Sequence, residues 1–366
     1  MNWQGIEEFL RQGVDHGVYP GASLGVLKLK GPTLISCAGK TSEKNGTLIT
    51  NETRFDLASL TKVFATASIC ARLCERGVVD LDERIVSEFP ELLWHPDWKE
   101  TKVREVLVHQ AGFMGWVDFA LELFARDLNR IKDSGEVLKG MLSHIAQSPA
   151  SYPAKSKTIY SDLGFIVLGC WLERKIQKSL SELLINEVCL PIKMKDFTFN
   201  PLHDGASLNL ITATEDIRWR GGLIHGVVHD DNAFIMGGVA GHAGIFGSVE
   251  DCLKMGHAWL EAIKKGNSFL SKIMAETFTT PVVAADRSQR ALGWDTPIAI
   301  GSSAGSLISK RSIGHLGYTG TSIWIDLVRE TVVVLLTNRV HPTSKNDSIR
   351  TFRPKLHDMI WKMVGP

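Results

Sequence analysis

The sequence predicts a mixed α/β fold of the α+β type, with an antiparallel sheet, flanking helices and a mostly helical inserted part. Two observations predict it: strand-like alternation gathers near both ends of the chain, and helical periodicity dominates the middle. With 44% hydrophobic and 22% charged residues, the composition is that of a globular protein with a large core. We expect one domain over residues 1–366, with a sheet part at about 1–60 and 285–366, a helical part at about 61–284, and a cleft between them.

The first predicted elements are a helix and a hairpin. Apolar residues recur at helical spacing from Trp3 to Val14, and Pro20 lies beyond the end of that helix. Residues 22–30 alternate as a strand, a Gly-Pro turn follows, and residues 33–38 form the hairpin partner.

Ser23 in the first strand is a competing nucleophile. Residues 21–25 match G-x-S-x-G, the nucleophile motif of α/β-hydrolases. That motif requires a strand before the serine and a helix after it. Here Pro20 precedes the motif and a strand follows, so we expect Ser23 to be an ordinary strand residue.

Beyond the hairpin, a long helix is expected from Ser59 to about Arg76, closed by Gly77. The middle of the chain then consists mainly of helical segments and loops. Helical periodicity is found at residues 103–108, 119–147, 163–177 and 249–263. Strands are predicted at residues 313–315, 321–327 and 331–337, and a terminal helix at about 353–364. Strands at both ends imply that the termini join in one antiparallel sheet.

Charge and composition argue against several classes of function. The net charge is +1, from 41 basic and 40 acidic residues, and no dense basic run indicates nucleic acid or an anionic membrane as a partner. No stretch is apolar for long enough to span a bilayer, and the first residues lack a secretory signal. The 6 cysteines contain no CxxC pair, which favours free thiols in a reducing compartment. We expect a cytoplasmic protein without cofactor or metal, or a periplasmic one if a leader was removed; the oligomeric state stays open.

The chemistry centres on Ser59 and Lys62, at the start of the long helix. Residues three apart on a helix lie on the same face, which brings the lysine nitrogen within hydrogen-bond reach of the serine hydroxyl. The first turn of a helix also offers free N–H groups to a developing oxyanion. A nucleophilic serine needs both a nearby base and such donors.

Three short signatures follow one another: Ser59-Leu60-Thr61-Lys62, Tyr160-Ser161-Asp162 and His315-Leu316-Gly317. This ordered set resembles the penicillin-recognising serine hydrolases, which are class C β-lactamases, DD-peptidases and the family VIII esterases on the same β-lactamase/transpeptidase-like fold. Their pattern is Ser-x-x-Lys, Tyr-x-Asn and Lys/His-x-Gly, at comparable separations. Other segments that look like parts of the family lie at residues 20–22, 108–112, 244–248 and 315–320. The resemblance therefore extends along nearly the whole chain.

The resemblance implies a role for each residue. Ser59 would be the nucleophile that forms an acyl-enzyme, and Lys62 would help to deprotonate it. Tyr160 would pass the proton to the leaving group and activate the deacylating water. The oxyanion hole would consist of the backbone N–H groups of Ser59 and Tyr318. Gly317 would keep the strand edge open, so that the acyl group can bind along the backbone.

Two residues depart from the pattern of lactam-binding members. Asp162 stands where those proteins usually have asparagine, and an ionised carboxylate accepts hydrogen bonds but donates none. It would either pair with Lys62 or repel a substrate carboxylate or an acylamino carbonyl. His315 would line the pocket where most relatives carry lysine, and it anchors a carboxylate less strongly at neutral pH. Both changes favour esters or unusual amides over β-lactam antibiotics.

The segment 225–232, with His242 further on, is rich in histidine and aspartate. We expect this loop to lie near the cleft and to shape substrate choice, with His229 and Asn232 as substrate-binding residues. A metal site built from His225, His229 and an aspartate is the alternative, although the chain has no H-E-x-x-H motif.

The leading hypothesis is a serine hydrolase that acts through an acyl-enzyme on an ester or amide, with a D-amino-acid peptide or a small ester as substrate. A second hypothesis is a catalytically weak penicillin-binding sensor or scaffold of the same fold. The third is an α/β-hydrolase with Ser23 as nucleophile. The true substrate, and whether β-lactams are hydrolysed or only bound, stay open.

Overall fold

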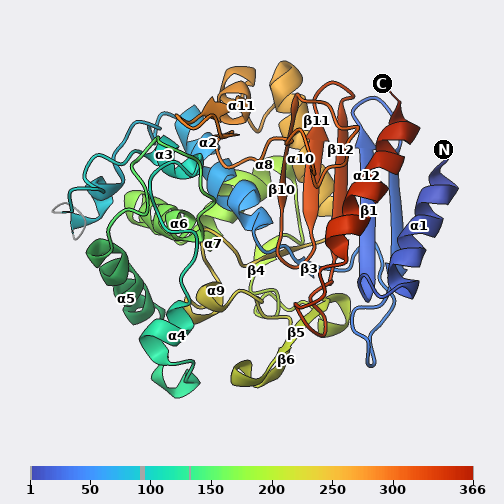
Figure 1. The fold of residues 1–366 in the computed structure, drawn as a ribbon, viewed down its shortest axis with the longest axis horizontal. Coiled ribbons are helices and arrows are strands. Elements are labelled where there is room, and N and C mark those ends of the chain that lie inside the picture. Colours follow the sequence, from blue (N-terminus) through green and yellow to red (C-terminus); the bar gives the residue numbers. More distant parts are fainter. Residues whose placement is uncertain (1, 91–94, 132, 366) are drawn as a thin grey trace.

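A five-stranded antiparallel sheet joins the two ends of the chain (Figure 1). The computed structural model describes residues 2–90, 95–131 and 133–365. The strand order is β10-β11-β12-β1-β2, so the N-terminal hairpin pairs with the C-terminal strands through β1 and β12. These strands are β1 (Gly21–Lys28), β2 (Thr33–Gly39), β10 (Ser312–Leu316), β11 (Ser322–Asp326) and β12 (Thr331–Thr337). The predicted sheet from both chain ends is confirmed.

Helices cover both faces of this sheet, and side chains of β12 alternate between the two cores. Val332, Val334 and Leu336 belong to the larger core. Val333 and Leu335 belong to the smaller core on the opposite face. Because both faces are covered, every residue of β12 is buried, which explains its uninterrupted apolar sequence.

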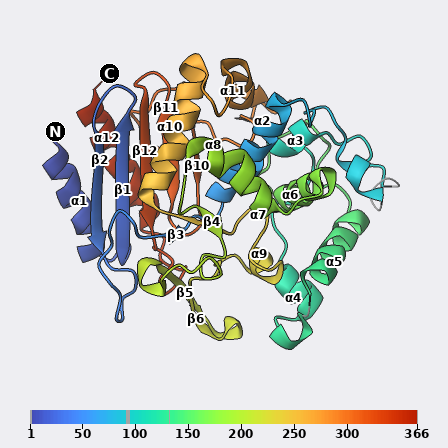
Figure 2. The ribbon, with the colours of Figure 1, turned by 180° about the vertical axis from the view of Figure 1, so that it is seen from behind.

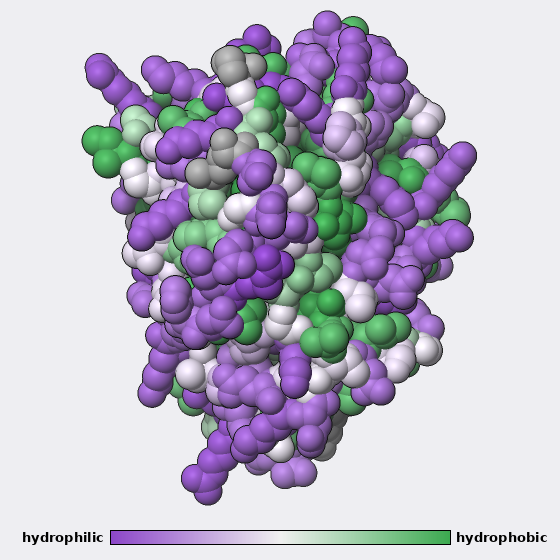
Figure 3. Space-filling model, turned by 90° about the vertical axis from the view of Figure 1, so that its right-hand side faces the viewer, coloured by the Kyte–Doolittle hydropathy of each residue, from purple (hydrophilic) through white to green (hydrophobic). Residues whose placement is uncertain are grey.

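The covering helices come from distant parts of the chain. They are α1 (Trp3–Asp15), α10 (Val249–Lys265) and α12 (Ile349–Val364). Helices α1 and α12 lie on the face seen in Figure 1, and α10 lies on the face seen in Figure 2. The surface on the side of α1 is mainly hydrophilic with scattered apolar groups (Figure 3), as expected for an amphipathic helix that buries one face.

The other half of the molecule is mainly helical. The helices are α2 (Ser68–Glu75), α3 (Val103–Leu107), α4 (Phe119–Phe124), α5 (Ser134–Gln147), α6 (Asp162–Ile176), α7 (Leu180–Leu183), α8 (Leu190–Ile192), α9 (Asp231–Ile235) and α11 (Lys272–Thr279). Residues 119–147, predicted to be helical, form α4 and α5 with a 3₁₀ turn between them; residue 132 in this stretch lies outside the described residues.

The middle of the chain contains short strands, of which the sequence predicts only the first, just before Ser59. They are β3 (Phe55–Asp56), β4 (Thr198–Phe199), β5 (Ala213–Ile217), β6 (Gly222–His225), β7 (Ile245–Gly247), β8 (Val282–Val283) and β9 (Gln289–Arg290). They form the small sheets β3-β7-β4, β5-β6 and β8-β9. Strands of two to five residues are too short to give a recognisable alternation, so only long-range pairing defines them.

The helix after Ser59 departs from a regular α-helix. Residues Lys62–Ala67 form a π-helical turn before α2 begins at Ser68, and the helix ends at Arg76 with Gly77 in the left-handed conformation, as predicted. Such turns occur frequently at functional sites.

Helix α10 bears on the division into a sheet part and a helical part. Its residues fall in the range assigned to the helical part, yet it packs on β1, β11 and β12. How the rest of the chain divides into a sheet part and a helical part stays a prediction.

Ser23 lies fully buried in β1, where its Oγ contacts Cys37 Sγ at 3.3 Å. The cysteines are free. None of the described helices is long and apolar enough to cross a membrane.

We predict that Gly256→Ala, in the middle of α10, destabilises the protein. An added Cβ would lie 2.4 Å from Val332 Cγ1 and 3.0 Å from Ile323 Cδ1, inside the core between helix and sheet. Overpacking of this kind costs about 1–3 kcal/mol, which outweighs the gain of about 1 kcal/mol in helix propensity. Urea unfolding measures the change. Gly5→Ala in α1 is the matched control, because its Cβ meets nothing closer than 3.5 Å and should stabilise slightly; equal effects of the two changes would contradict the predicted packing.

Candidate active site

Ser59 follows a sharp backbone turn at the end of β3. Ala58, the residue before it, has a φ of 46°, in the left-handed region that alanine rarely adopts. The buried side chain of Asp56 holds this turn, since its Oδ1 accepts a hydrogen bond of 2.8 Å from the N–H of Ala58. The turn leaves Ser59 partly exposed at the start of the helix.

Lys62 is fully buried, and its Nζ contacts Ser59, His242 and Asp162. Its Nζ donates hydrogen bonds of 3.0 Å to Ser59 Oγ and of 3.0 Å to the carbonyl oxygen of His242. It also forms an ion pair of 2.6 Å with Asp162 Oδ1. Of the two possibilities that the sequence leaves open for Asp162, the structure shows the pairing with Lys62.

Tyr160 completes the group, with its ring centre 4.8 Å from Lys62 Nζ. Burial raises the pKa of Tyr160 to about 12, although Lys62 acts in the opposite direction. For Lys62, burial lowers the pKa, but the charges of Asp162 and Tyr160 outweigh it and leave the pKa above that of a free lysine. At neutral pH the resting site therefore holds an ammonium at Lys62 and an uncharged phenol at Tyr160.

His315 lies in β10 beside this group, with its ring 5.8 Å from that of Tyr160. The side chain is buried, and burial lowers the pKa of His315 to about 4. Its imidazole is therefore uncharged at neutral pH. The sequence predicts that His315 anchors a carboxylate only weakly at neutral pH, and burial of the ring, which cannot be read from the local residues, weakens this further.

Gly317 follows β10 at a place where no side chain fits. A Cβ there would lie 2.0 Å from Thr321 Oγ1 and 2.6 Å from the carbonyl oxygen of Leu57. The glycine thus lets the end of β10 approach the turn before Ser59. Tyr318 comes next, and neither its N–H nor that of Ser59 has a hydrogen-bond acceptor among the described residues.

The backbone of Tyr318 is held from behind by Arg339. The Nε and Nη2 atoms of Arg339 donate hydrogen bonds of 2.9 Å and 2.6 Å to the carbonyl oxygen of Tyr318. The guanidinium carbon also lies 4.8 Å from the centre of the Tyr318 ring. The sequence does not single out Arg339; the only signal is a charged residue shortly after the apolar strand β12.

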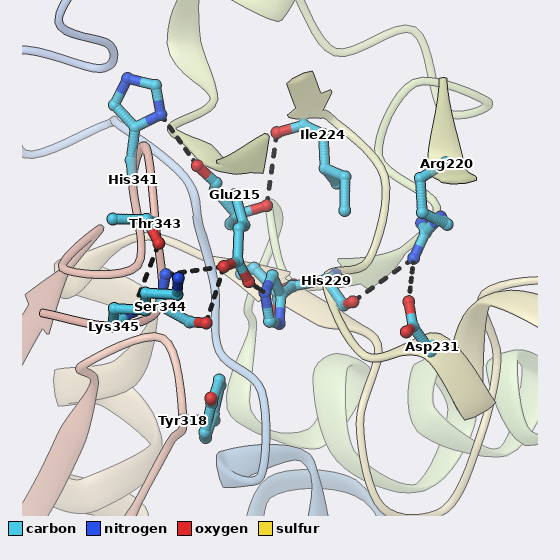
Figure 4. Close-up of polar contacts among 12 residues, drawn as sticks. Glu215, Arg220, Ile224, His229, Asp231, Tyr318, His341, Thr343, Ser344 and Lys345 are labelled. Carbon is cyan, nitrogen blue, oxygen red and sulfur yellow. Dashed lines mark hydrogen bonds and ion pairs between the residues drawn. The ribbon is translucent and has the colours of Figure 1, made fainter. Parts of the chain in front are cut away.

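The ring of His229 stacks on the ring of Tyr318, with the ring centres 5.6 Å apart (Figure 4). Its Nε2 contacts Glu215 Oε2 at 2.9 Å, and its N–H donates to Asp56 Oδ2 at 2.7 Å. Glu215 also accepts hydrogen bonds of 2.7 Å from the N–H and Oγ of Ser344. Burial opposes the charge on Glu215, but these hydrogen bonds outweigh it and lower its pKa to about 2.

Seven of the predicted site residues line one cleft, whereas Lys62 and Asn232 are fully buried and do not line it. A cavity of about 1000 Å³ is lined by Ser59, Tyr160, Asp162, His229, His315, Gly317 and Tyr318. Asn232 lies apart and is fully buried: its Oδ1 accepts from the N–H of Phe119 at 3.1 Å, and its Nδ2 donates to the carbonyl of Val117 at 2.8 Å. In the structure it holds a neighbouring loop.

The cleft also contains charged residues that the sequence does not indicate. Arg290 and Asp295 form an ion pair of 2.5 Å, and the guanidinium of Arg290 lies 5.1 Å from the Tyr160 ring centre. His242, which the sequence already associates with the segment 225–232, is buried and contacts Asp230 Oδ1 through its Nε2 at 2.8 Å. As to the metal alternative, the described residues include no group of three or more His, Cys, Asp or Glu side chains suited to hold an ion.

Comparison with known proteins agrees with this geometry. The model of a family described as Beta-lactamase matches residues 6–356. The chain is 30% identical over 365 residues to a protein of Escherichia coli strain K12 named "Putative D-alanyl-D-alanine carboxypeptidase", covering 92% of this chain and 82% of that one. It is 30% identical over 313 residues to the N-acetylmuramyl-L-alanine amidase of Bacillus subtilis strain 168, covering 79% and 68%. The resemblance predicted from the three motifs is confirmed.

Solved structures of the same fold are more distant in sequence. The octameric penicillin-binding protein homologue from Pyrococcus abyssi has a TM-score of 0.75 at 18% identity, covering 98% of this chain and 78% of that one. Simvastatin synthase from Aspergillus terreus has a TM-score of 0.74 at 19% identity, covering 98% and 97%. These likenesses confirm the predicted fold class.

We predict that His315 stays uncharged down to about pH 5, and that the protein loses stability below the pKa of a free histidine. Because the pKa of His315 falls to about 4 on folding, only the unfolded chain takes up this proton between about pH 6.5 and pH 4. The contribution is intact above pH 6.5 and is lost as the pH falls, by at most about 3 kcal/mol. Urea unfolding at pH 7 and pH 5 should show a smaller loss for His315→Asn than for the wild type. His16→Asn, at an exposed position, is the control; an unchanged loss in His315→Asn would refute the assignment.

Proposed function

This chain belongs to the β-lactamase family, and we propose that it is a serine hydrolase that cleaves an ester or amide through an acyl-enzyme on Ser59. The observation that carries the proposal is the 3.0 Å contact between Lys62 Nζ and Ser59 Oγ in a cleft that also contains Tyr160. A base, a nucleophile and a second proton carrier thus meet where a substrate has access.

The proton chemistry depends on the pair of Lys62 and Asp162. Lys62 is an ammonium at rest and cannot accept a proton in that form. It first passes a proton to Asp162 across their 2.6 Å contact, which leaves a neutral amine beside Ser59. The amine then takes the hydroxyl proton as Ser59 Oγ attacks the carbonyl carbon. Tyr160 gives its proton to the leaving group and recovers one from Lys62; water then repeats the sequence in deacylation.

The oxyanion would be bound by the N–H groups of Ser59 and Tyr318, which have no other acceptor among the described residues. Donors that are fixed before the reaction stabilise the developing charge without reorganisation. Arg339 is a positioning residue in this proposal, because its two hydrogen bonds to the Tyr318 carbonyl fix the peptide that follows the donor.

The substrate proposed is a peptide of the peptidoglycan type. The relatives named above carry names that refer to D-alanyl-D-alanine and to N-acetylmuramyl-L-alanine, both of which contain an amide bond. The uncharged imidazole of His315 argues against β-lactam antibiotics, because it offers no cation to their carboxylate. The alternative is a penicillin-binding sensor of the same fold, in which the acyl-enzyme would form and persist.

We expect Ser59→Ala to lower turnover of a chromogenic ester by about 10³–10⁶-fold, since it removes the nucleophile. Ser23→Ala should leave turnover nearly unchanged, because Ser23 is buried in β1. Intact mass spectrometry with a fluorophosphonate, followed by peptide mapping, should place the label on Ser59. A label on another serine would contradict the proposal, and a stable ester adduct without turnover would favour the sensor.

We expect Asp162→Asn to move the acid limb of the kcat/KM profile to higher pH. In the wild type, the pair can rearrange to the reactive amine without losing a proton, whereas in the variant Lys62 itself must be deprotonated. Removal of the carboxylate also lets burial lower the Lys62 pKa, which ¹³C-methyl labelling of lysines can follow by NMR. Asp216→Asn, an exposed carboxylate in the same cleft, is the control. An acid limb that moves to lower pH would show that Asp162 only keeps Lys62 protonated.

A further inference from the structure

Two tryptophans line the same cleft as Ser59 and have no role in the proposed chemistry. Trp116 lies in the loop before α4 and is 53% exposed, which is unusual for so large an apolar side chain. Trp219 lies at the tip of the β5-β6 hairpin and is partly buried against Phe234. An exposed indole in a cleft offers a flat apolar face to a ligand.

Consecutive residues of α9 hold both tryptophan-bearing segments. Asn232 bonds the backbone of Val117 and Phe119, which follow directly after Trp116 at the entry to α4. Asp231 forms an ion pair of 3.0 Å with Arg220, which follows Trp219 and also donates to the carbonyl of Val228 at 2.9 Å (Figure 4). One short helix therefore sets the position of two segments that are about a hundred residues apart in the sequence. This gives the buried Asn232 a part in substrate choice without contact with the substrate.

The loop of Trp116 is also attached to the segment that contains Tyr160. The carbonyl of Gly115 accepts from the N–H of Asp162 at 2.8 Å, and the carbonyl of Met114 accepts from Ser161 Oγ at 2.6 Å. A ligand group on Trp116 would thus adjoin the reacting centre.

The cleft that the two indoles line also contains charged side chains. Arg126 and Arg218 are among them, and the Arg218 side chain has no hydrogen bond or ion pair with any residue that the structure describes. An apolar acyl chain placed there would desolvate these charges without compensation. A pyranose ring presents apolar C–H faces to the indoles and hydroxyl or acetamido groups at its rim, where such side chains can pair with them.

We propose that Trp116 and Trp219 form a subsite for the N-acetylated hexopyranose of a sugar-linked peptide, whose peptide end is directed to Ser59. The inference rests on the proposed function and makes its substrate more specific, because it assigns the sugar a place in the cleft. The charged side chains and the two indoles of this cleft together distinguish this ligand from a bare peptide or a lipid.

Binding to Ser59→Ala tests the proposal, because this variant cannot turn the ligand over. Isothermal titration should be carried out with N-acetylmuramyl-L-alanyl-D-isoglutamine, N-acetyl-L-alanyl-D-isoglutamine and N-octanoyl-L-alanyl-D-isoglutamine. We expect the sugar-linked peptide to bind at least about 10-fold more tightly than the other two. Added Trp116→Leu or Trp219→Leu should remove most of that preference, and Trp116→Phe should retain part of it because a flat ring remains.

The outcomes separate the subsite from the catalytic proposal. Equal binding of the sugar-linked and acetylated peptides would overturn the subsite, as would tighter binding of the octanoyl peptide or an undiminished preference in folded Leu variants. A preference that persists while fluorophosphonate fails to label wild-type Ser59 would support the subsite and contradict the hydrolase. Urea unfolding of each variant verifies the fold, and the Phe variants of both tryptophans keep the test informative if a Leu variant does not fold.

Discussion

The buried ion pair between Lys62 and Asp162 is the interaction on which the rest of the site depends. A fully buried ammonium without a partner costs several kcal/mol, so the lysine nitrogen must be surrounded by acceptors. These acceptors come from the helix start, from the first residue of α6 and from the carbonyl of His242. Asp162 is itself favoured at the positive end of α6. Three distant segments therefore fix one nitrogen atom, and that atom orients Ser59.

A second constraint joins the sheet to this cluster. The turn after β10 donates hydrogen bonds from Thr319 Oγ1 to the carbonyl of Asp56 at 2.7 Å and from Thr321 Oγ1 to that of Leu57 at 3.1 Å. Because these bonds reach the residues just before Ser59, the left-handed conformation of Ala58 is held from two sides. Backbone strain of this kind persists only where the surroundings over-determine it. The contacts between the turn after β10 and the residues before Ser59 therefore fix the position of Ser59 relative to Tyr318.

The sequence predicts those features that depend on local spacing. Ser59 and Lys62 lie one turn apart in a single helix, and the apolar strands at both ends of the chain identify their own sheet. It also predicts that the three motifs meet, but only through their order in a known family. Features that depend on enclosure escape it: the lowered pKa of His315, the contact of Arg339 with Tyr318 and the burial of Asn232 all arise from residues far away in the chain. The short strands β4–β9 escape it for the same reason.

The distribution of charge around the cleft follows from these contacts. Lys62 and Asp162 neutralise one another, and His315 is uncharged, so these three side chains offer no free cation to a substrate. Behind the turn, Arg339 and Arg353 donate to backbone carbonyls and have no carboxylate partner among the described residues. Burial lowers the pKa of Arg353 to about 10, which still leaves it charged at neutral pH. Both guanidinium groups thus contact the turn that carries the proposed oxyanion donor, where their charge acts in a low dielectric. A substrate carboxylate next to His315 gains no direct ion pair from this arrangement, and the binding energy of a peptide must come from other parts of the cleft.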